Sequence, residues 1–442
     1  MSGELETTAS RCHFWLPNKR RHCANTPLPS SVYCGNHNPS SAPKRVPCPI
    51  DPSHTVLQDS LELHVKRCPF KKQVDALEAK PYYSKSINAG DSDEPTVSSA
   101  DKRGSIHRLS TSDFWGLINK IKSVHSSVVQ VLRDSYLVPE SCEKWLKGQL
   151  DKSLPYQEKH VVQQASILGN MESFGILQKE NNDAISGTEN SKSEVRKNDV
   201  AVVEFGAGRG YLTQMLADCY SVRKVFLIER RSYKLKADRS LRQNESLALE
   251  RLRIDIEDLN LCGVDSLKGV PYLATGKHLC GPATDLTINC CMGENRKEGK
   301  GEIKGLAIAT CCHHLCQWKH YKNKKFLSDI GINKKEFHAM TWFSSWAVDG
   351  DHSSDDPSIE DEAKPLKVCE KTEAHSDSGG IERIIRSMPA IERAAFGFMC
   401  KEIIDTGRLL WLKENEFDAQ LVSYVPFSIS PENHLLIAKK QS

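Results

Sequence analysis

Apolar runs of strand length alternate with stretches of helical periodicity along the second half of the chain. The first run, residues 202–205, breaks into closely spaced glycines and resumes as a helical pattern at Tyr211. Further strands are predicted at residues 225–228, 252–254, 272–274 with its extension, and 306–309. After a predicted helix at 390–404, runs at 419–424 and 435–438 predict two closing strands joined by a Pro/Ser turn. This alternation predicts an open α/β sheet.

The segments outside the predicted sheet differ in pattern. Apolar periodicity over residues 113–180 predicts a helical segment whose role is packing. Ser, Asp, Lys and Gly dominate residues 81–112, which predicts a solvated linker. Residues 349–380 are rich in Asp, Ser, Glu and Gly, and we expect a disordered insertion there.

Composition and charge narrow the class of protein only slightly. The chain has 442 residues, which leaves room for roughly two to four domains. Its 60 Lys and Arg residues nearly balance 57 Asp and Glu residues, so its net charge neither demands nor excludes nucleic acid, although residues 1–80 are mildly basic. No stretch reads as a secretory signal or approaches the roughly 20 apolar residues of a membrane span. We therefore expect a soluble intracellular protein, in the nucleus or the cytoplasm.

Sixteen cysteines in a reducing compartment predict metal binding, burial or chemistry rather than disulfides. Two sets near the N-terminus have the spacing of metal ligands: Cys12, Cys23, Cys34 and His37, then Cys48, His54, His64 and Cys68. Four soft ligands suit a closed tetrahedral Zn²⁺ site, so we expect two structural zinc ions. The metal would supply the folding free energy, on the order of 10 kcal/mol in zinc-finger peptides. His13 and His22 are alternative ligands of the first site.

The glycines after the first predicted strand indicate a cofactor loop. A dinucleotide fingerprint would need a third glycine at Tyr211, but the glycines here are Gly206, Gly208 and Gly210, preceded by Glu204. Glu-x-Gly-x-Gly-x-Gly instead resembles the first motif of Rossmann-like methyltransferases. That resemblance implies that the loop holds S-adenosylmethionine and that the leading acid faces its methionine end.

Two acids at the ends of later strands extend this interpretation. Glu229 ends the second predicted strand, where a carboxylate can bind both ribose hydroxyls of the cofactor. Asp255 follows the third strand, at the position where methyltransferases of this class recognise adenine. A surface acid after a strand is also ordinary, so Asp255 remains open between cofactor binding and a local structural role.

The fourth and fifth predicted strands end in residues that can carry chemistry. Ligands of open α/β sheets lie beyond the carboxyl ends of the strands. The fourth strand ends in Lys277 and His278, with Asp285 further on, and the fifth ends in a Cys-Cys-His-His run at residues 311–314. Three interpretations of that run stay open: a third zinc site, a cysteine nucleophile of the kind that methylates pyrimidine carbon, or buried cysteines with a capping histidine. Contiguous residues cannot all converge on one tetrahedral metal without strain.

Taken together, these motifs resemble one family over nearly the whole chain. Residues 10–40 resemble the CCCH finger, and residues 45–72 the CHHC finger, of eukaryotic tRNA methyltransferases that modify the ribose of nucleotide 4 in the acceptor stem. The glycine loop and residues 277–281 and 311–314 resemble their catalytic domain. The resemblance implies a Rossmann-like class I methyltransferase domain over residues 198–442, with tRNA as the partner and no obligatory protein partner. The fingers would dock the acceptor stem by shape, phosphates and 2′-hydroxyls.

Transfer of a methyl group to a ribose hydroxyl needs alignment and removal of a proton. Lys277 is expected to activate the hydroxyl or stabilise the developing alkoxide, and His278 or His313 to accept the proton. The Lys-Asp-Lys-Glu set of other ribose methyltransferases of this fold has no counterpart here. The alternatives are a base or protein methyltransferase, and a zinc-finger RNA-binding adaptor with an inactive methyltransferase-like domain.

Overall fold

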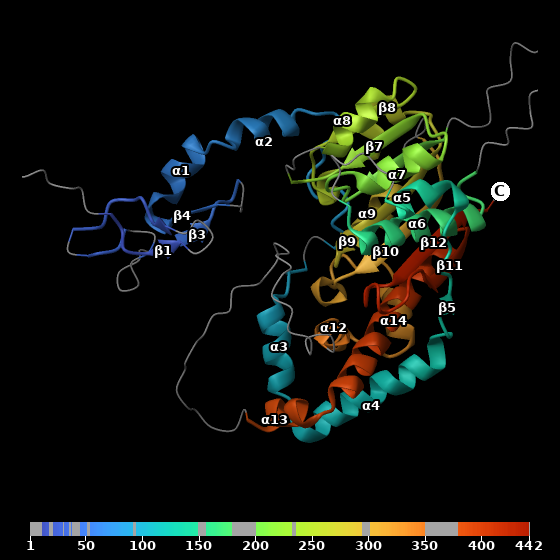
Figure 1. The fold of residues 1–442 in the computed structure, drawn as a ribbon. Helices are drawn as coiled ribbons and strands as arrows, with labels where there is room; N and C mark the ends of the chain where they lie inside the picture. Colours follow the sequence, from blue (N-terminus) through green and yellow to red (C-terminus); the bar gives the residue numbers. More distant parts are fainter. Residues whose placement is uncertain are drawn as a thin grey trace, which may run out of the picture. The chain divides into compact units, whose positions relative to one another are not determined.

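A computed structural model describes twelve stretches of the chain, and they fall in two compact units, Met1–Lys80 and Pro81–Ser442 (Figure 1). The described residues are 11–16, 21–29, 31–34, 37, 45–50, 54–91, 94–148, 156–178, 200–231, 236–293, 301–349 and 379–441. Residues 350–378, most of the predicted insertion, lie outside them. Within these stretches, no helix has the length and apolar character that a membrane crossing requires.

The N-terminal unit consists of short elements around the predicted metal ligands. Its elements are β1 (Trp15–Leu16), β2 (Arg21–His22), β3 (Arg45–Pro47), β4 (Thr55–Leu57), η2 (Gln58–Ser60), α1 (Leu61–Arg67) and α2 (Lys71–Glu78). β1 pairs with β2, and β3 with β4, both antiparallel. The buried centre of the first finger consists of three cysteines with Leu16 and Tyr33 packed against them. So small an apolar cluster cannot offset the entropy of folding, which leaves that role to a metal.

The larger unit is built on an eight-stranded sheet with the order β5-β11-β12-β10-β9-β6-β7-β8. The strands are β5 (Arg133–Asp134), β6 (Ala201–Phe205), β7 (Lys224–Ile228), β8 (Ala248–Leu252), β9 (Tyr272–Cys280), β10 (Ile303–Cys311), β11 (Phe417–Ser423) and β12 (His434–Lys440). The neighbours from β8 to β10 pair parallel, and β12 pairs antiparallel with both β10 and β11. This confirms the predicted α/β class with a closing antiparallel hairpin.

Two strands differ from the prediction, for physical reasons visible in their sequences. β8 begins at Ala248 and ends at Leu252, whereas the apolar pattern placed it at 252–254. Glu250 and Arg251 interrupt its apolar run because β8 lies at the edge of the sheet. β5 was not predicted, since two exposed polar residues, Arg133 and Asp134, carry no strand pattern; they pair with β11 at the other edge.

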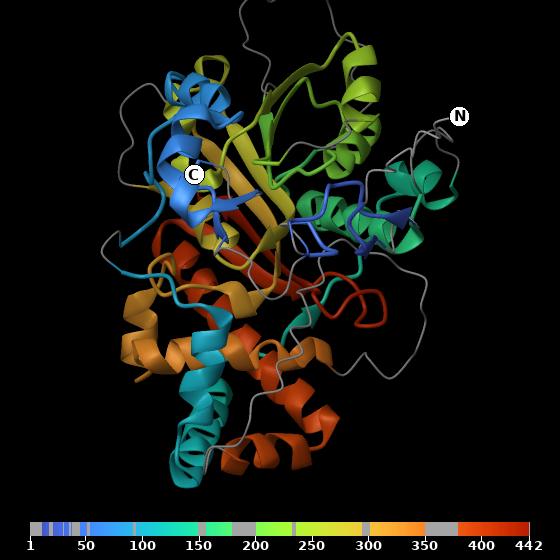
Figure 2. The same ribbon diagram turned by 90° about the vertical axis from the view of Figure 1, so that its left-hand side faces the viewer.

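Helices cover both faces of the sheet and form two separate apolar cores. The helices are α3 (Ser99–His107), α4 (Thr111–Val128), α5 (Glu143–Leu146), α6 (Glu158–Ser173), α7 (Tyr211–Cys219), α8 (Lys236–Gln243), α9 (Ala283–Met292), α10 (Lys324–Asp329), α11 (Lys334–Phe343), α12 (Trp346–Asp349), α13 (Gly379–Ser387) and α14 (Ala390–Glu414). Short 3₁₀ turns are η3 (Glu140–Cys142), η4 (Ile256–Asp258), η5 (Leu261–Gly263), η6 (Asp265–Leu267) and η7 (His313–Leu315). One core joins α5, α6 and α7 to the sheet. The other core lies among α3, α4, α11 and α14. These four helices gather at one end of the unit in Figures 1 and 2.

The predicted solvated linker at 81–112 is wrong. Asn88 donates hydrogen bonds to the carbonyl oxygens of Ile256 (2.7 Å) and Leu259 (2.8 Å). In α3, the Lys102 ammonium is buried and donates to the carbonyl oxygens of His314 (3.0 Å) and Cys316 (2.7 Å). Polar composition predicted solvent exposure, whereas these polar groups are buried because backbone acceptors satisfy them.

Candidate functional site

The glycine loop joins β6 to α7 and needs glycine at all three positions. Gly206, Gly208 and Gly210 have φ values of +59°, +51° and +81°, in the left-handed region that side chains disfavour. A Cβ at Gly206 would lie 3.1 Å from Leu279 Cδ2, whereas one at Gly208 would meet nothing within 4 Å. The backbone is therefore packed on β9 at Gly206 and open at Gly208, as a loop that must admit a ligand requires.

Glu229 directly follows β7 and lies against this loop. Gly208 N–H donates to Glu229 Oε2 (3.0 Å), and Arg231 N–H donates to Oε1 (2.8 Å). Each carboxylate oxygen can accept a further hydrogen bond. The carboxylate is thus held in place beside the open part of the loop, with capacity left for the paired hydroxyls of a ribose.

Asp255 has local partners. Its Oδ1 accepts from Glu257 N–H (3.1 Å) and so caps η4, and its Oδ2 lies 3.2 Å from the guanidinium of Arg230. The side chain remains 38% exposed. This geometry supports the local structural role and leaves room for a ligand, so adenine recognition by Asp255 stays a prediction.

Glu204, the leading acid of the motif, is buried beneath the start of α7. Its Oε2 accepts hydrogen bonds from Thr213 N–H (3.0 Å) and from the Thr213 hydroxyl. Burial raises the pKa of Glu204 to about 7, and the two bonds from Thr213 oppose that rise. Glu204 therefore fixes β6 to the first turn of α7, whatever further contact it makes with a cofactor.

Lys277 and His278 lie in a bulge of β9. The register with β10 runs from Gly276↔Ile308 to Leu279↔Thr310, so β9 carries one extra residue there. A bulge re-aims side chains, and here Lys277 is 7% exposed while His278 is exposed. In a regular strand, successive side chains would simply alternate between the two faces of the sheet, so the bulge sets where Lys277 and His278 point.

The ammonium of Lys277 points to a residue that the sequence did not predict. Its Nζ lies 3.1 Å from His160 Nδ1 and 3.4 Å from the His160 carbonyl oxygen, so α6 contributes directly to this site. Burial lowers the pKa of Lys277 to about 7, although the negative charge of Glu204 opposes the shift. A buried amine with a pKa near neutrality can gain or lose a proton at working pH.

His313 does not belong with Lys277, which corrects the expectation that it accepts a proton. Its side chain is wholly buried, and its Nε2 lies 2.9 Å from Asp405 Oδ2. The same oxygen accepts from Thr310 Oγ1 (2.9 Å) and lies 2.9 Å from His434 Nδ1, while Arg408 donates to Oδ1 (2.9 Å). Burial lowers the pKa of His313. His313 therefore ties β10 to α14 and β12.

Asp285 is likewise structural. Arg408 Nη2 donates to Asp285 Oδ2 at 2.5 Å, and both side chains are only 1% exposed. The Lys322 N–H donates to Asp285 Oδ1 (3.2 Å). Arg408 thus lies between two buried carboxylates, an arrangement that compensates its own buried charge. Arg408 and Asp405 escaped prediction because they lie within a long helix without a motif.

The two predicted zinc sites have their ligands in place. In each set the four ligand atoms lie within 4.8 Å of one another. Cys23 Sγ and Cys34 Sγ are 4.0 Å apart, and Cys48 Sγ and Cys68 Sγ are 3.8 Å apart. Tetrahedral Zn²⁺ with Zn–S bonds of about 2.3 Å places its sulfur ligands about 3.8 Å apart, so both sets fit zinc.

The first site gathers His37 rather than the alternative histidines. His37 Nδ1 lies 3.4 Å from both Cys12 Sγ and Cys34 Sγ, and the Phe14 ring stacks on the His37 imidazole. His22 Nδ1 lies 3.1 Å from the carbonyl oxygen of His13. Neither His13 nor His22 belongs to the clustered ligand set.

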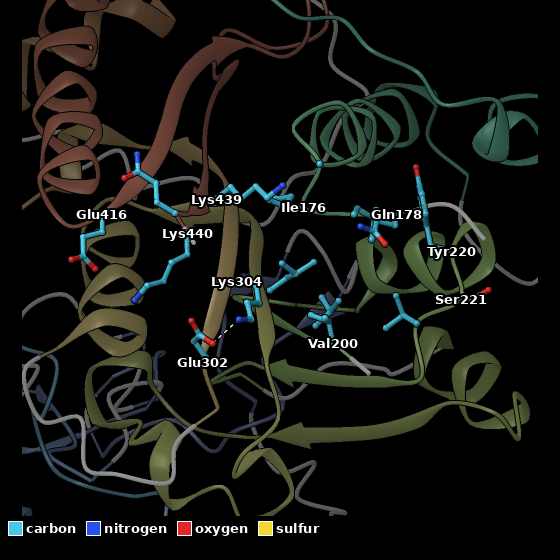
Figure 3. Close-up of a pocket in the computed structure, with 16 residues that line it drawn as sticks. Ile176, Gln178, Val200, Tyr220, Ser221, Glu302, Lys304, Glu416, Lys439 and Lys440 are labelled. Atoms are coloured by element: carbon cyan, nitrogen blue, oxygen red, sulfur yellow. Dashed lines mark hydrogen bonds and ion pairs between the residues drawn. The ribbon is translucent and has the colours of Figure 1, made fainter. Parts of the chain in front are cut away.

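A cavity of about 810 Å³ lies elsewhere, and Figure 3 shows its lining. Val200 and the ion pair Glu302–Lys304 line it near the amino ends of β6 and β10, with Lys439 from the end of β12. Ligands of open α/β sheets bind at the carboxyl ends of the parallel strands. We therefore assign the candidate site to the glycine loop and the β9 bulge, not to this cavity.

Comparison with known proteins identifies three regions. The family described as Methyltransferase TRM13 matches residues 162–439, the CCCH zinc finger in TRM13 protein matches 10–38, and the U11-48K-like CHHC zinc finger matches 45–69. The chain is 59% identical to the tRNA:m(4)X modification enzyme TRM13 of Oryza sativa subsp. japonica over 234 residues, 51% of this chain and 91% of that protein. It is 30% identical to the tRNA:m(4)X modification enzyme TRM13 homolog of Homo sapiens over 485 residues, 97% of this chain and 94% of that protein.

Proposed function

We propose that the chain, which belongs to the TRM13 methyltransferase family, transfers a methyl group from S-adenosylmethionine to the ribose 2′-hydroxyl of nucleotide 4 in the tRNA acceptor stem. One observation carries the proposal. A Cβ on Gly206 would lie 3.1 Å from Leu279 and 3.4 Å from the His278 carbonyl oxygen, so the cofactor loop packs directly on the bulge that holds Lys277. The name of these relatives, tRNA:m(4)X modification enzyme, supports tRNA as the substrate.

The cofactor supplies a methyl group already activated on a sulfonium, so the protein must align the hydroxyl and remove its proton. Glu229 and the backbone at Gly208 would hold the cofactor, with Glu204 supporting the loop from below. Asp255 is the candidate residue for recognising the adenine of the cofactor. The residues present fit the cofactor because the loop is open at Gly208 and the adjacent carboxylate is oriented by two N–H donors.

We assign removal of the 2′-hydroxyl proton to Lys277. During methyl transfer, the proton of the 2′-hydroxyl would pass to the neutral amine of Lys277 at Nζ. His160, 3.1 Å from that nitrogen, positions it, and His278 on the exposed side of the bulge is placed to meet the RNA. The pKa of about 7 leaves a substantial fraction of Lys277 unprotonated at neutral pH.

The two fingers would bind one Zn²⁺ each through the eight clustered ligands and would dock the acceptor stem. Recognition of double-stranded RNA rests on shape, phosphates and 2′-hydroxyls, which a small rigid module with basic side chains can contact. In this proposal the metal is structural and takes no part in methyl transfer, because four protein ligands leave it no open position.

The test is methyl transfer from labelled S-adenosylmethionine to unmodified tRNA, with the product mapped by nucleotide. A ribose methyl at nucleotide 4 blocks nuclease cleavage of the adjoining phosphodiester and supports the proposal. Label on a base would overturn the ribose assignment. No transfer by protein that binds both cofactor and zinc would overturn the proposed activity in favour of an RNA-binding adaptor.

A further inference from the structure

Three cysteines come together at the carboxyl ends of β9 and β10. Cys280 is the last residue of β9, Cys311 the last of β10, and the two are register partners in the parallel pair. Cys311 Sγ lies 3.4 Å from Cys280 Sγ. Cys312 completes the group, with all three sulfurs within 4.8 Å of one another. The contiguous Cys-Cys-His-His run is thus divided, since its cysteines join Cys280 and His313 joins Asp405.

We propose that Cys280, Cys311 and Cys312 form a third metal site, which binds one thiophilic d¹⁰ cation, Zn²⁺ or Cu⁺, through three thiolates. Soft sulfur ligands select these metals over hard cations such as Mg²⁺. The Cys280 and Cys311 sulfurs, 3.4 Å apart, are somewhat closer than the corresponding sulfurs in the two fingers, at 4.0 Å and 3.8 Å, so a small shift lets them share one metal. The inference does not depend on the proposed methyl transfer.

The backbone at Cys312 supports a ligand role. Consecutive residues of a strand point to opposite faces, so Cys311 and Cys312 would diverge if β10 continued. Cys312 instead has φ +49°, a left-handed conformation rare for residues other than glycine, and is the N-cap residue directly before η7. This turn brings two adjacent thiols to one point. Strained positions of this kind cluster at ligand sites.

The surroundings suit one ion rather than a larger cluster. Three sulfurs within 4.8 Å can share one metal, since sulfurs on tetrahedral Zn²⁺ lie about 3.8 Å apart. Cys280 is solvent-exposed, so an ion can enter from outside. A water can fill a fourth position. The bound ion would fix the end of β9 three residues beyond Lys277.

The test is the metal content of the full chain, purified in reductant without chelator and measured by inductively coupled plasma mass spectrometry. We expect one equivalent more than the two fingers hold, with the mass spectrum distinguishing zinc from copper. Cys280→Ser should remove that one equivalent. Cys262→Ser, a partly exposed cysteine outside every clustered set, is the matched control and should keep the full metal content.

Cobalt titration tests the same site without depending on purified occupancy or on activity. In metal-free protein with its fingers refilled by zinc, a further equivalent of Co²⁺ should give sulfur-to-cobalt charge-transfer absorption, which Cys280→Ser and Cys312→Ser each weaken. Circular dichroism confirms that these variants are folded. Metal content of two equivalents in the natural chain, together with no added absorption, would overturn the site. So would a third equivalent that Cys280→Ser leaves in place.

Discussion

The N-terminal fingers and the larger unit, Pro81–Ser442, here called the catalytic unit, are held together in opposite ways. The first finger buries three ligand cysteines, and among its described residues only the apolar side chains of Leu16 and Tyr33 pack against them. The catalytic unit buries two extended apolar cores and, between β10, β12 and α14, a hydrogen-bonded network of histidine, aspartate and arginine side chains. The fingers depend on ligands close in sequence, while the catalytic unit depends on contacts between distant segments. Each unit should therefore fail under different changes.

The largest expected effect is that of removing zinc. Cys23→Ser together with Cys48→Ser should unfold both fingers, because metal binding supplies on the order of 10 kcal/mol in such modules. The melting transition of Pro81–Ser442 should stay where it was, since that unit has its own cores. Calorimetry and NMR of the full chain would show the two responses. Fingers that remain folded without metal would contradict the view that metal, rather than an apolar core, holds them together.

The next effect concerns chemistry in the catalytic unit alone. Lys277→Met should lower kcat by about 10²- to 10⁴-fold, the usual contribution of a general acid or base, while cofactor affinity and both fingers persist. Lys304→Met is the matched control. That lysine, at the start of β10, lines the cavity at the amino ends of the strands, so kcat should not change. Equal losses in both variants would remove Lys277 from the mechanism.

The pH dependence of kcat/KM distinguishes a proton-accepting role of Lys277 from a purely structural one. Burial lowers its pKa to about 7, so the active neutral amine accumulates as pH rises through that value. We expect kcat/KM to rise with pH, to reach half its maximum at about 7, and to level off above that value. His160→Gln should shift this inflection, because His160 Nδ1 lies 3.1 Å from the amine. A profile flat from pH 6 to 8 would contradict the assignment.

The contrast between local ligands in the fingers and distant contacts in the catalytic unit also explains what the sequence could predict. The finger ligands and the glycine loop follow local spacing, and their geometry agrees with it. Lys277 and His160 are 117 positions apart, so no local pattern could join them. The predicted linker failed for a related reason: composition cannot show that Lys102 finds two buried carbonyl acceptors. His313 carried the right chemistry at a strand end, but burial against Asp405 removed it from the site.

The next prediction removes charge from the buried network. Arg408→Met leaves Asp285 and Asp405 buried without their shared cation and should destabilise the catalytic unit by about 3 to 5 kcal/mol. Arg386→Met is the matched control, because Arg386 pairs with Glu382 while 77% exposed; such pairs contribute about 0 to 1 kcal/mol. Urea unfolding measures both. A small effect at Arg408 would mean that the network does not stabilise this unit.

The smallest effects distinguish the two acids beside the cofactor loop. Glu229→Gln keeps an oxygen that can accept from Gly208 N–H but loses the charge, and hydrogen bonds to charged groups contribute about 1.5 to 3 kcal/mol. We expect cofactor affinity to fall by about 10- to 100-fold. Calorimetric titration with S-adenosylmethionine would measure this.

Asp255→Asn should change that affinity by less than about threefold, because Asp255 already caps η4 and its pairing with Arg230 is exposed. An asparagine oxygen retains the cap, so the fold should not change. If Asp255→Asn instead weakens binding as much as Glu229→Gln, Asp255 recognises the adenine directly and its bond to the Glu257 N–H is secondary. Local spacing would then have predicted the cofactor contacts of the catalytic unit as well as it predicted the ligands of the fingers.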